Sequence, residues 1–391
     1  MKSFAGPVIS TVTLVISLMI AELCLRIFAP IPDPYEVSKT KSAYVTSQFP
    51  PNLRLVTEPE EGVPGVHGKN VFTTNNMGFR GDYLSIPKPD HEYRVFIVGG
   101  SAAECFILDD SQAINAVVQD NLSKNLPEST SVKVYNAGKS GDRSYDHVAM
   151  IVHRIVHLQP DMIILFAGVN DLTAAIYNAD YLHYSKTGSE IRFSFSFLAR
   201  MIATESQIGR RAYHLLASFS RKTDRQILEK ITLKSDLKEK VQLRKSVPVS
   251  SVKPRADPVG YEQNLRTIAG VAKAHGIRLV FMTQPSTWNS HVDSRTREWH
   301  WLLYRNGRTY DEALMDVALD SLNRVMSEVA SEQGVELFDL AKSIPKSIDF
   351  FVDDVHFNVK GAREAGNQLA SFILERDFIA RADGHNRRRS S

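Results

Sequence analysis

Short apolar runs that alternate with helical patterns constrain the fold of this 391-residue chain more than any other feature. Five such runs, each rich in β-branched or aromatic residues, lie at 94–98, 132–135, 162–166, 278–283 and 335–340. Helical patterns cover about 112–125, 144–156, 258–274, 311–332 and 360–374. Continuously apolar strands are typical of parallel sheets that are buried on both faces. The alternation therefore predicts a doubly wound, three-layer α/β/α fold with a five-stranded, mainly parallel sheet.

The start of the chain predicts a membrane segment within residues 1–28. No charged residue lies between Lys2 and Glu22, and residues 8–20 are almost wholly apolar. A helix of about 20 residues spans a hydrocarbon core of about 30 Å. A retained anchor, a cleaved signal peptide and a buried helix of a soluble domain are the three interpretations, and we expect the anchor. The positive charges around the segment orient it only weakly. We expect a single-pass cell-membrane protein with its main domain outside the cytoplasm, because the segment starts the chain like an export signal.

Composition divides the rest of the chain into regions. Prolines are frequent at 29–34 and 49–51, so we expect a stalk and lead-in over 29–90, followed by a main domain over 91–378. A region at about 180–256 interrupts the strand–helix alternation. Residues 379–391 are expected to form a disordered basic tail.

The interrupting region is strongly basic. Residues 186–255 hold 16 Lys and Arg against 6 Asp and Glu, a net charge of +10 in a chain whose total is +3. It is interpreted either as a solvated helical insertion or as a surface for anionic lipid headgroups or an acidic polymer. The small total charge gives no indication of nucleic-acid binding, and no nucleic-acid partner is expected. Two cysteines cannot form a disulfide framework.

Ser101 is the first candidate catalytic residue along the chain. It follows the first predicted strand directly, after Gly99 and Gly100. Small residues permit a sharp turn that exposes a hydroxyl at a helix start, close to backbone N–H groups that can stabilise an oxyanion. A serine in this position is equally typical of a helix N-cap.

Asp353 and His356 are separated by three positions just before the last predicted helix. A carboxylate bonded to one ring nitrogen fixes the imidazole tautomer and leaves the other nitrogen able to accept a proton. Two alternatives are a capping carboxylate beside a surface histidine and a metal site that includes Asp354. No further ligand cluster supports a metal, and no cofactor is expected.

Two further polar turns follow the second and third predicted strands. Gly141 lies in a turn after the second strand whose glycines can offer an unobstructed backbone N–H. Asn170 follows the third strand within the sequence Gly-Val-Asn-Asp, where its side-chain amide can donate a hydrogen bond to an oxyanion. A tight strand-to-helix turn without a catalytic role is the alternative interpretation of both motifs. Ligands bind beyond the carboxyl ends of the strands in such sheets, so these residues are expected to converge.

The order Ser, Gly, Asn, Asp-x-x-His resembles the SGNH, or GDSL-like, hydrolase superfamily over about 93–374. The resemblance implies that Ser101 is the nucleophile, that Asp353 and His356 form its base, and that Ser101, Gly141 and Asn170 form the oxyanion hole. It implies a flavodoxin-like fold and a serine esterase that hydrolyses or transfers an acyl group, with acetyl expected, through a covalent ester. Neither route requires a metal or organic cofactor.

The lead-in sequence Asn-Asn-Met-Gly-Phe-Arg-Gly at 75–81 also resembles membrane-anchored bacterial members, although Asn76 is one residue closer to the glycine. The Gly-Asp-Ser-Leu motif that gives the family its name is altered here, because Gly100 stands where the family has Asp. An α/β-hydrolase is disfavoured because its Asp and His are usually far apart in sequence, and the glycines lack the dinucleotide-binding spacing. The other alternative is a catalytically silent relative that binds acylated glycan or assists its assembly. The basic region and the anchor suggest a cell-surface polysaccharide as the acyl carrier.

Overall fold

The computed structural model describes residues 5–31, 45, 48–127, 129–176, 206–219, 237–254, 258–305 and 307–379. Much of the predicted stalk, more than half of the predicted basic insertion and residues 380–391 of the predicted tail lie outside these ranges. The chain divides into two units, one formed by Met1–Lys39 with Thr187–Thr232 and the other by Thr40–Lys186 with Leu233–Ser391.

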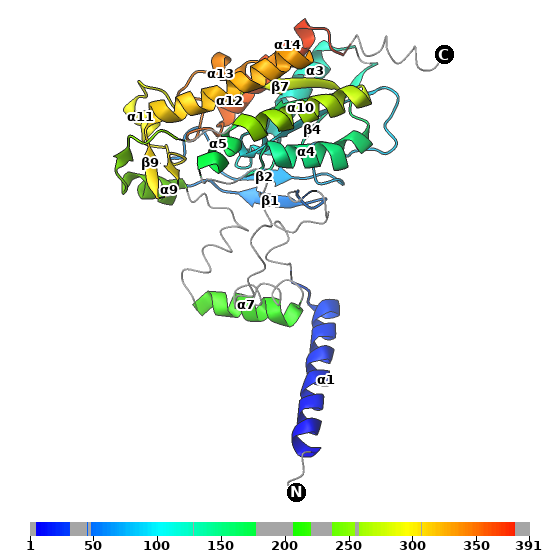
Figure 1. Cartoon of the computed structure of the whole chain (residues 1–391). Coiled ribbons are helices and arrows are strands. Elements are labelled where there is room, and N and C mark those ends of the chain that lie inside the picture. Colours follow the sequence, from blue (N-terminus) through cyan, green and yellow to red (C-terminus); the bar gives the residue numbers. More distant parts are fainter. Residues whose placement is uncertain are drawn as a thin grey trace. The chain divides into compact units, whose positions relative to one another are not determined.

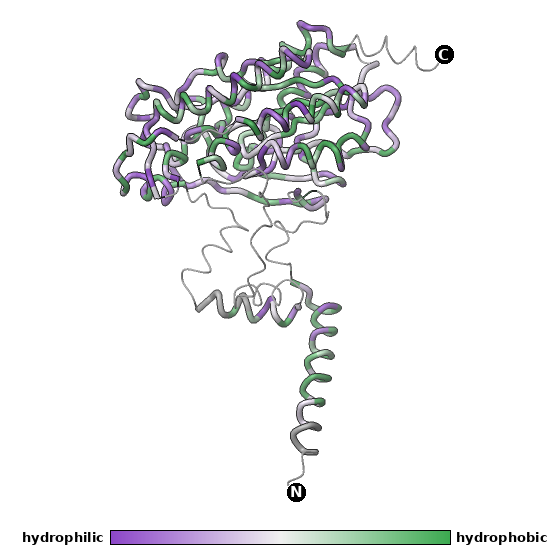
Figure 2. The backbone as a smooth tube through the Cα atoms, in the orientation of Figure 1, coloured by the Kyte–Doolittle hydropathy of each residue, from purple (hydrophilic) through white to green (hydrophobic). Residues whose placement is uncertain are grey.

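The first unit contains helices α1 (Ala5–Phe28) and α7 (Gln207–Phe219). The segment Ser10–Phe28 of α1 is long and apolar enough to cross a membrane, a property that signal sequences share. Figure 2 shows the hydrophobic stretch of this helix in green. Glu22 accepts hydrogen bonds from the N–H groups of Gln207 (2.8 Å) and Ile208 (3.0 Å). This carboxylate therefore caps the first turn of α7, whose N–H groups have no partner within the helix.

The second unit is built on a parallel sheet (Figure 1). Its strands are β3 (Glu92–Gly99), β4 (Ser131–Asn136), β5 (Met162–Phe166), β7 (Arg278–Met282) and β10 (Glu336–Phe338). The order is β4-β3-β5-β7-β10, and every neighbouring pair is parallel. The predicted five-stranded parallel sheet is confirmed. Since β4 and β5 flank β3 on opposite sides, the strand order reverses at β3, and open α/β sheets bind ligands at such a reversal.

Helices cover both faces of this sheet, which explains why its strands read as continuous apolar runs. Alternate strand residues are buried in two separate clusters. Helices α4 (Ser144–His153), α10 (Pro258–His275) and α12 (Glu312–Gln333) cover the first cluster and lie side by side in Figure 1. Helices α3 (Ile114–Asn125) and α14 (Val359–Glu375) pack together over the second.

The helix ends follow capping chemistry. Asp311 accepts from the N–H groups of Ala313 (2.9 Å) and Leu314 (3.2 Å) and so begins α12. Asn358 accepts from the N–H of Gly361 (2.9 Å) and begins α14. The helix expected over 144–156 is shorter, because α4 ends at His153 and a 3-10 turn, η3 (Ile155–Leu158), follows.

Smaller elements surround the sheet. They are a hairpin of β1 (Arg54–Thr57) and β2 (Asn70–Thr73), a second sheet of β6 (Val249–Ser250), β8 (Tyr304–Arg305) and β9 (Arg308–Tyr310), and the short helices α2 (Ser101–Glu104), η2 (Asp110–Gln112), α5 (Val169–Ile176), α9 (Leu237–Lys245), α11 (Ser294–Arg297) and α13 (Leu340–Ser343). Leu237 and Val241 of α9 are buried in the core, and β6 pairs with β9. The last part of the predicted insertion therefore belongs to the body of the second unit.

Candidate active site

Ser101 is the first residue of α2, immediately after β3. β3 is buried along its whole length, so its end is fixed by the sheet. Gly100 precedes Ser101 with extended backbone (φ −85°, ψ −153°), which turns the chain from strand to helix. The serine side chain is thereby held at the carboxyl edge of the sheet, where the strand order reverses.

Gly100 lies very close to the side chain of Asn170. A Cβ atom on Gly100 would lie 2.4 Å from Nδ2 of Asn170, which follows β5. That amide nitrogen donates to the carbonyl oxygen of Asp142 at 2.7 Å. In this chain the Asn170 amide lies where a side chain at position 100 would begin, so a larger residue there would displace it.

His356 lies between Ser101 and Asp353. Its Nε2 is 2.8 Å from Oγ of Ser101, and its Nδ1 is 2.7 Å from Oδ2 of Asp353. Oδ1 of Asp353 also accepts from the backbone N–H groups of Val355 (3.0 Å) and His356 (2.9 Å). A short turn therefore supplies both the carboxylate and the N–H groups that orient it, and 255 residues of sequence separate this turn from Ser101.

The electrostatics of this pair favour an ionised carboxylate and a basic imidazole. Burial opposes ionisation, yet the charge and hydrogen bond of His356 and the N–H donors hold the pKa of Asp353 at about 2. Burial likewise opposes protonation of His356, but the facing Asp353 carboxylate raises the pKa of the imidazole above its ordinary value. His356 can therefore readily accept a proton from a group that is hydrogen-bonded to its Nε2 atom.

Gly141 lies in the turn after β4, with φ +80°, a conformation that glycine adopts without strain. Its neighbours tie this turn to the serine: the N–H of Ser140 donates to the Glu104 carboxylate at the end of α2, and the carbonyl of Asp142 receives the Asn170 amide. The ends of β3, β4 and β5 thus meet. The structure brings Ser101, Asp353 and His356 into direct contact and holds Asn170 and the Gly141 turn beside Gly100.

A cavity of about 230 Å³ opens beside these groups. Ser101, Asp353 and His356 line it together with mainly apolar side chains: Ala102, Cys105, Phe106, Ile107, Leu237, Trp301, Val352 and Phe357. Lys240 of α9 also lines it. A larger cavity of about 350 Å³ beside α12 and α13 includes none of the three contacting residues.

The sequence did not identify two residues that shape this site. Trp301 lines the cavity, and its indole N–H donates to Oδ2 of Asp353 at 2.8 Å. Arg80, from the lead-in, is buried and donates to the carbonyl oxygens of Glu104 (2.9 Å), Cys105 (2.8 Å) and Leu108 (3.0 Å). Arg80 therefore fixes the turn that forms one cavity wall. The lead-in motif was a signal for Arg80, whereas no local pattern marks Trp301.

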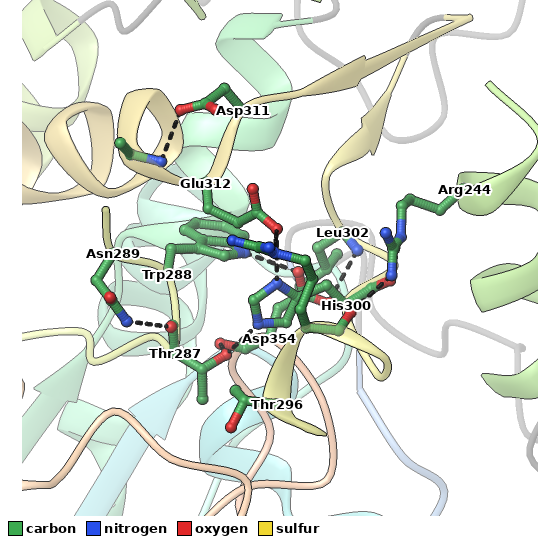
Figure 3. Close-up of polar contacts among 12 residues, drawn as sticks. Arg244, Thr287, Trp288, Asn289, Thr296, His300, Leu302, Asp311, Glu312 and Asp354 are labelled. Atoms are coloured by element: carbon green, nitrogen blue, oxygen red, sulfur yellow. Dashed lines mark hydrogen bonds and ion pairs between the residues drawn. The ribbon is translucent and has the colours of Figure 1, made fainter. Parts of the chain in front are cut away.

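The predicted metal alternative has no support in the described part of the chain, where no cluster of three or more His, Cys, Asp or Glu is placed to hold an ion. Asp354 instead accepts from the indole N–H of Trp288 (2.7 Å) and from the backbone N–H groups of Trp301 (2.7 Å) and Leu302 (3.0 Å). Figure 3 shows it in the middle of a buried polar network. Its acceptor sites are directed at these donors.

Comparison with protein families matches residues 97–364 to the family described as "GDSL-like Lipase/Acylhydrolase family". Among solved structures, a lipase/acylhydrolase from Enterococcus faecalis aligns with 72% of this chain and 96% of its own, at 15% identity and a TM-score of 0.40. An acetylxylan esterase from Geobacillus stearothermophilus aligns with 74% of this chain and 94% of its own, at 15% identity and a TM-score of 0.39. A search of curated proteins found no match.

Proposed function

Because the chain belongs to the GDSL-like lipase/acylhydrolase family and is a hydrolase of ester bonds, we propose that it is a serine esterase with Ser101 as nucleophile. The observation that carries the proposal is the continuous contact from Ser101 Oγ through His356 to Asp353, with distances of 2.8 Å and 2.7 Å. This is the arrangement that a weakly nucleophilic hydroxyl needs, since the imidazole removes its proton during attack.

The reaction has two halves. His356 Nε2 takes the Ser101 proton while Oγ attacks the ester carbonyl, and the resulting imidazolium then protonates the departing alcohol. In the second half the same nitrogen activates a water molecule, which releases the acid and restores Ser101. Asp353 stabilises the imidazolium and fixes its tautomer throughout. An alcohol in place of water would make the same residues an acyltransferase.

Three donors hold the negative oxygen that forms during attack. They are the backbone N–H groups of Ser101 and Gly141 and the side-chain amide of Asn170. The hydrogen bond from Asn170 to the Asp142 carbonyl uses one amide proton and orients the group beside the serine turn. Loss of one such donor costs roughly 3–4 kcal/mol of barrier, so a preorganised amide is a substantial part of the rate.

The cavity supports a short acyl group. Its volume of about 230 Å³ is far above the roughly 10–15 Å³ that a single water molecule needs by this measure. An acetyl group fits with space left over, and the mainly apolar walls suit an alkyl chain of a few carbons. We propose an acetyl ester on a cell-surface polysaccharide as the substrate, and the charge of +10 over residues 186–255 favours an acidic polymer.

We further propose that α1 anchors the protein in the cell membrane and that the second unit faces outward. The apolar length of Ser10–Phe28 supports a span. Two measurements test this. Intact-mass analysis of the untreated protein is expected to find the full-length chain, and protease treatment of intact cells is expected to cleave its second unit from outside. A chain that begins after residue 28 would indicate a cleaved signal instead.

A fluorophosphonate probe tests the nucleophile without knowledge of the substrate. The full chain in detergent is expected to be labelled, Ser101→Ala is not, and His356→Ala is labelled much more slowly. Ser123→Ala, an exposed serine on α3, is the matched control and keeps full labelling. A folded parent that does not react, or a Ser101→Ala variant that does, would refute the proposal.

The substrate is tested separately. Hydrolysis of p-nitrophenyl esters from C2 to C10 is expected to be fastest for short acyl chains and to decline once the chain exceeds the cavity. Acetate release from acetylated acidic glycans should exceed release from acetylated neutral glycans at low salt and lose that advantage at high salt. Equal rates on both glycans would reject the acidic carrier while leaving the nucleophile intact.

A further inference from the structure

The side chain of Trp301 contacts both members of the proposed base. Its indole N–H donates to Asp353 Oδ2 at 2.8 Å, the oxygen that also faces His356 Nδ1. Its ring lies parallel to the imidazole of His356, with an interplanar angle of 7° and ring centroids 6.4 Å apart. The tryptophan thus restrains the carboxylate through a hydrogen bond and the imidazole through its ring plane.

The neighbouring carboxylate holds the backbone of Trp301. Asp354 is fully buried and accepts from the N–H groups of Trp301 (2.7 Å) and Leu302 (3.0 Å). The indole of Trp288 completes its set of donors at 2.7 Å. Since Asp354 directly follows Asp353, one turn of chain both presents the carboxylate to His356 and fixes the residue that donates to that carboxylate.

A second layer secures the same segment. His300 Nε2 is 2.8 Å from Oγ1 of Thr287, and its carbonyl accepts from Nε of Arg244 at 2.9 Å. Arg244 lies in α9, and the guanidinium also donates to the carbonyl of Arg297 at 2.6 Å. Figure 3 shows Arg244 at the right of the view, directed toward the His300 segment, with Trp288 and Thr287 on the opposite side. Trp301 is therefore held in place independently of Asp353.

We propose that Trp301 is a positioning residue that fixes the carboxylate of Asp353 and the ring plane of His356 for proton transfer from Ser101. This inference rests on the esterase function proposed above. Two backbone N–H groups hold Oδ1 of Asp353, and the indole of Trp301 holds Oδ2, the oxygen that also faces His356. Without it, the Oδ2 side of the carboxylate lacks a rigid donor.

The indole also affects the basicity of the pair. The charged groups that act on His356 are Asp353 and Asp354, which raise its pKa, and Lys240, which lowers it. The Trp301 N–H helps to hold the pKa of Asp353 low. Removal of that donor makes the carboxylate more basic, which strengthens its attraction for the imidazolium and raises the pKa of His356 further. A group that only fills space would leave this pKa unchanged.

The test compares Trp301→Phe with Trp299→Phe in the full chain. Phenylalanine keeps a ring but lacks the N–H, and Trp299 lies two residues away, packed against the core. For Trp301→Phe, kcat/KM for a p-nitrophenyl ester is expected to fall about ten- to a hundredfold, as for a hydrogen bond to a charged group. The acid limb of its pH profile should move upward by up to about one pH unit. Trp299→Phe should leave the limb in place.

A Trp301→Phe protein that folds and keeps the parental acid limb would overturn the proposal, whatever its kcat/KM. Should that variant fail to fold, the unaltered protein decides: the ¹⁵N–¹H resonance of the Trp301 indole is expected to titrate with the midpoint of the acid limb, and a resonance that does not move overturns the proposal. Failure of the esterase function is distinguishable, because the parent would then show neither Ser101-dependent labelling nor ester hydrolysis.

Discussion

Substitution of Gly100 by alanine is expected to damage catalysis through a single displaced amide. The backbone at Gly100 is extended, so alanine adopts it without strain, and the effect comes from contact alone. The added Cβ would lie 2.4 Å from Asn170 Nδ2, whereas ordinary contact begins at 3.4 Å. The amide must therefore move by about 1 Å, which disturbs the hydrogen bond to the Asp142 carbonyl that now orients it.

The magnitude follows from that displacement. A misplacement of about 1 Å in a catalytic group can cost about 100-fold, and complete loss of an oxyanion donor about 100- to 1,000-fold. We therefore expect kcat of Gly100→Ala to fall about 100-fold. The added methyl group and the weakened hydrogen bond should lower the free energy of unfolding by about 1–3 kcal/mol.

The assay is steady-state hydrolysis of p-nitrophenyl acetate together with urea unfolding. Gly270→Ala in α10 is the matched control, because its Cβ would meet no atom within 4 Å. That variant should gain up to about 1 kcal/mol of stability from the helix preference of alanine, with kcat unchanged. A folded Gly100→Ala protein with kcat within about threefold of the parent would refute the role assigned to Asn170 or the tightness of this turn.

Four further outcomes are expected. Asp353→Asn should lower kcat about 10,000-fold in the same ester assay, since the amide stabilises the wrong imidazole tautomer; a loss of less than tenfold would contradict the assigned role. Because the pKa of His356 is raised and the base must be neutral, kcat/KM should decline as pH falls through a midpoint above about 6.5; a midpoint below 6 would be inconsistent with the facing carboxylate. Arg80→Met should lower the free energy of unfolding, measured in urea, by more than about 3 kcal/mol, because three carbonyl groups lose their donor. Lys133 is partly exposed, so Lys133→Met should change this free energy by less than about 1 kcal/mol. Equal effects of the two substitutions would contradict the role of Arg80 in holding the turn. Burial opposes ionisation of Glu312, but contacts with His300 and Arg297 hold its pKa at about 2. The ionised carboxylate therefore stabilises the fold above the unfolded pKa near 4.5, and this stabilisation is lost as the pH falls toward 2. Glu312→Gln should lose less stability than the parent between pH 5 and pH 2, and an equal loss would exclude this carboxylate as the cause.

The sequence determined the sheet and the edge at which the polar turns meet. The central strands β3 and β5 are buried along their whole length, so they appear in the sequence as largely apolar runs that can be recognised without knowledge of their neighbours. Parallel strands place all their carboxyl ends at one edge, so Ser101, Asn170 and the Gly141 turn were expected to converge there. Asp353 and His356 are close in sequence, which made their pairing predictable from spacing alone.

Only the tertiary structure decided what surrounds these groups. Trp301 reaches Asp353 across 52 positions of sequence and Arg80 reaches Glu104 across 24, and neither residue lies in a periodic pattern. The close approach of Gly100 to Asn170, 70 positions later, also emerged only from the structure. Burial of α9 likewise joined the end of a region that reads as a basic insertion to the cavity wall. Local sequence records which residues suit a strand or a turn, whereas contacts between distant segments depend on how helices and loops pack on the sheet, and that packing leaves no repeating signal in the chain.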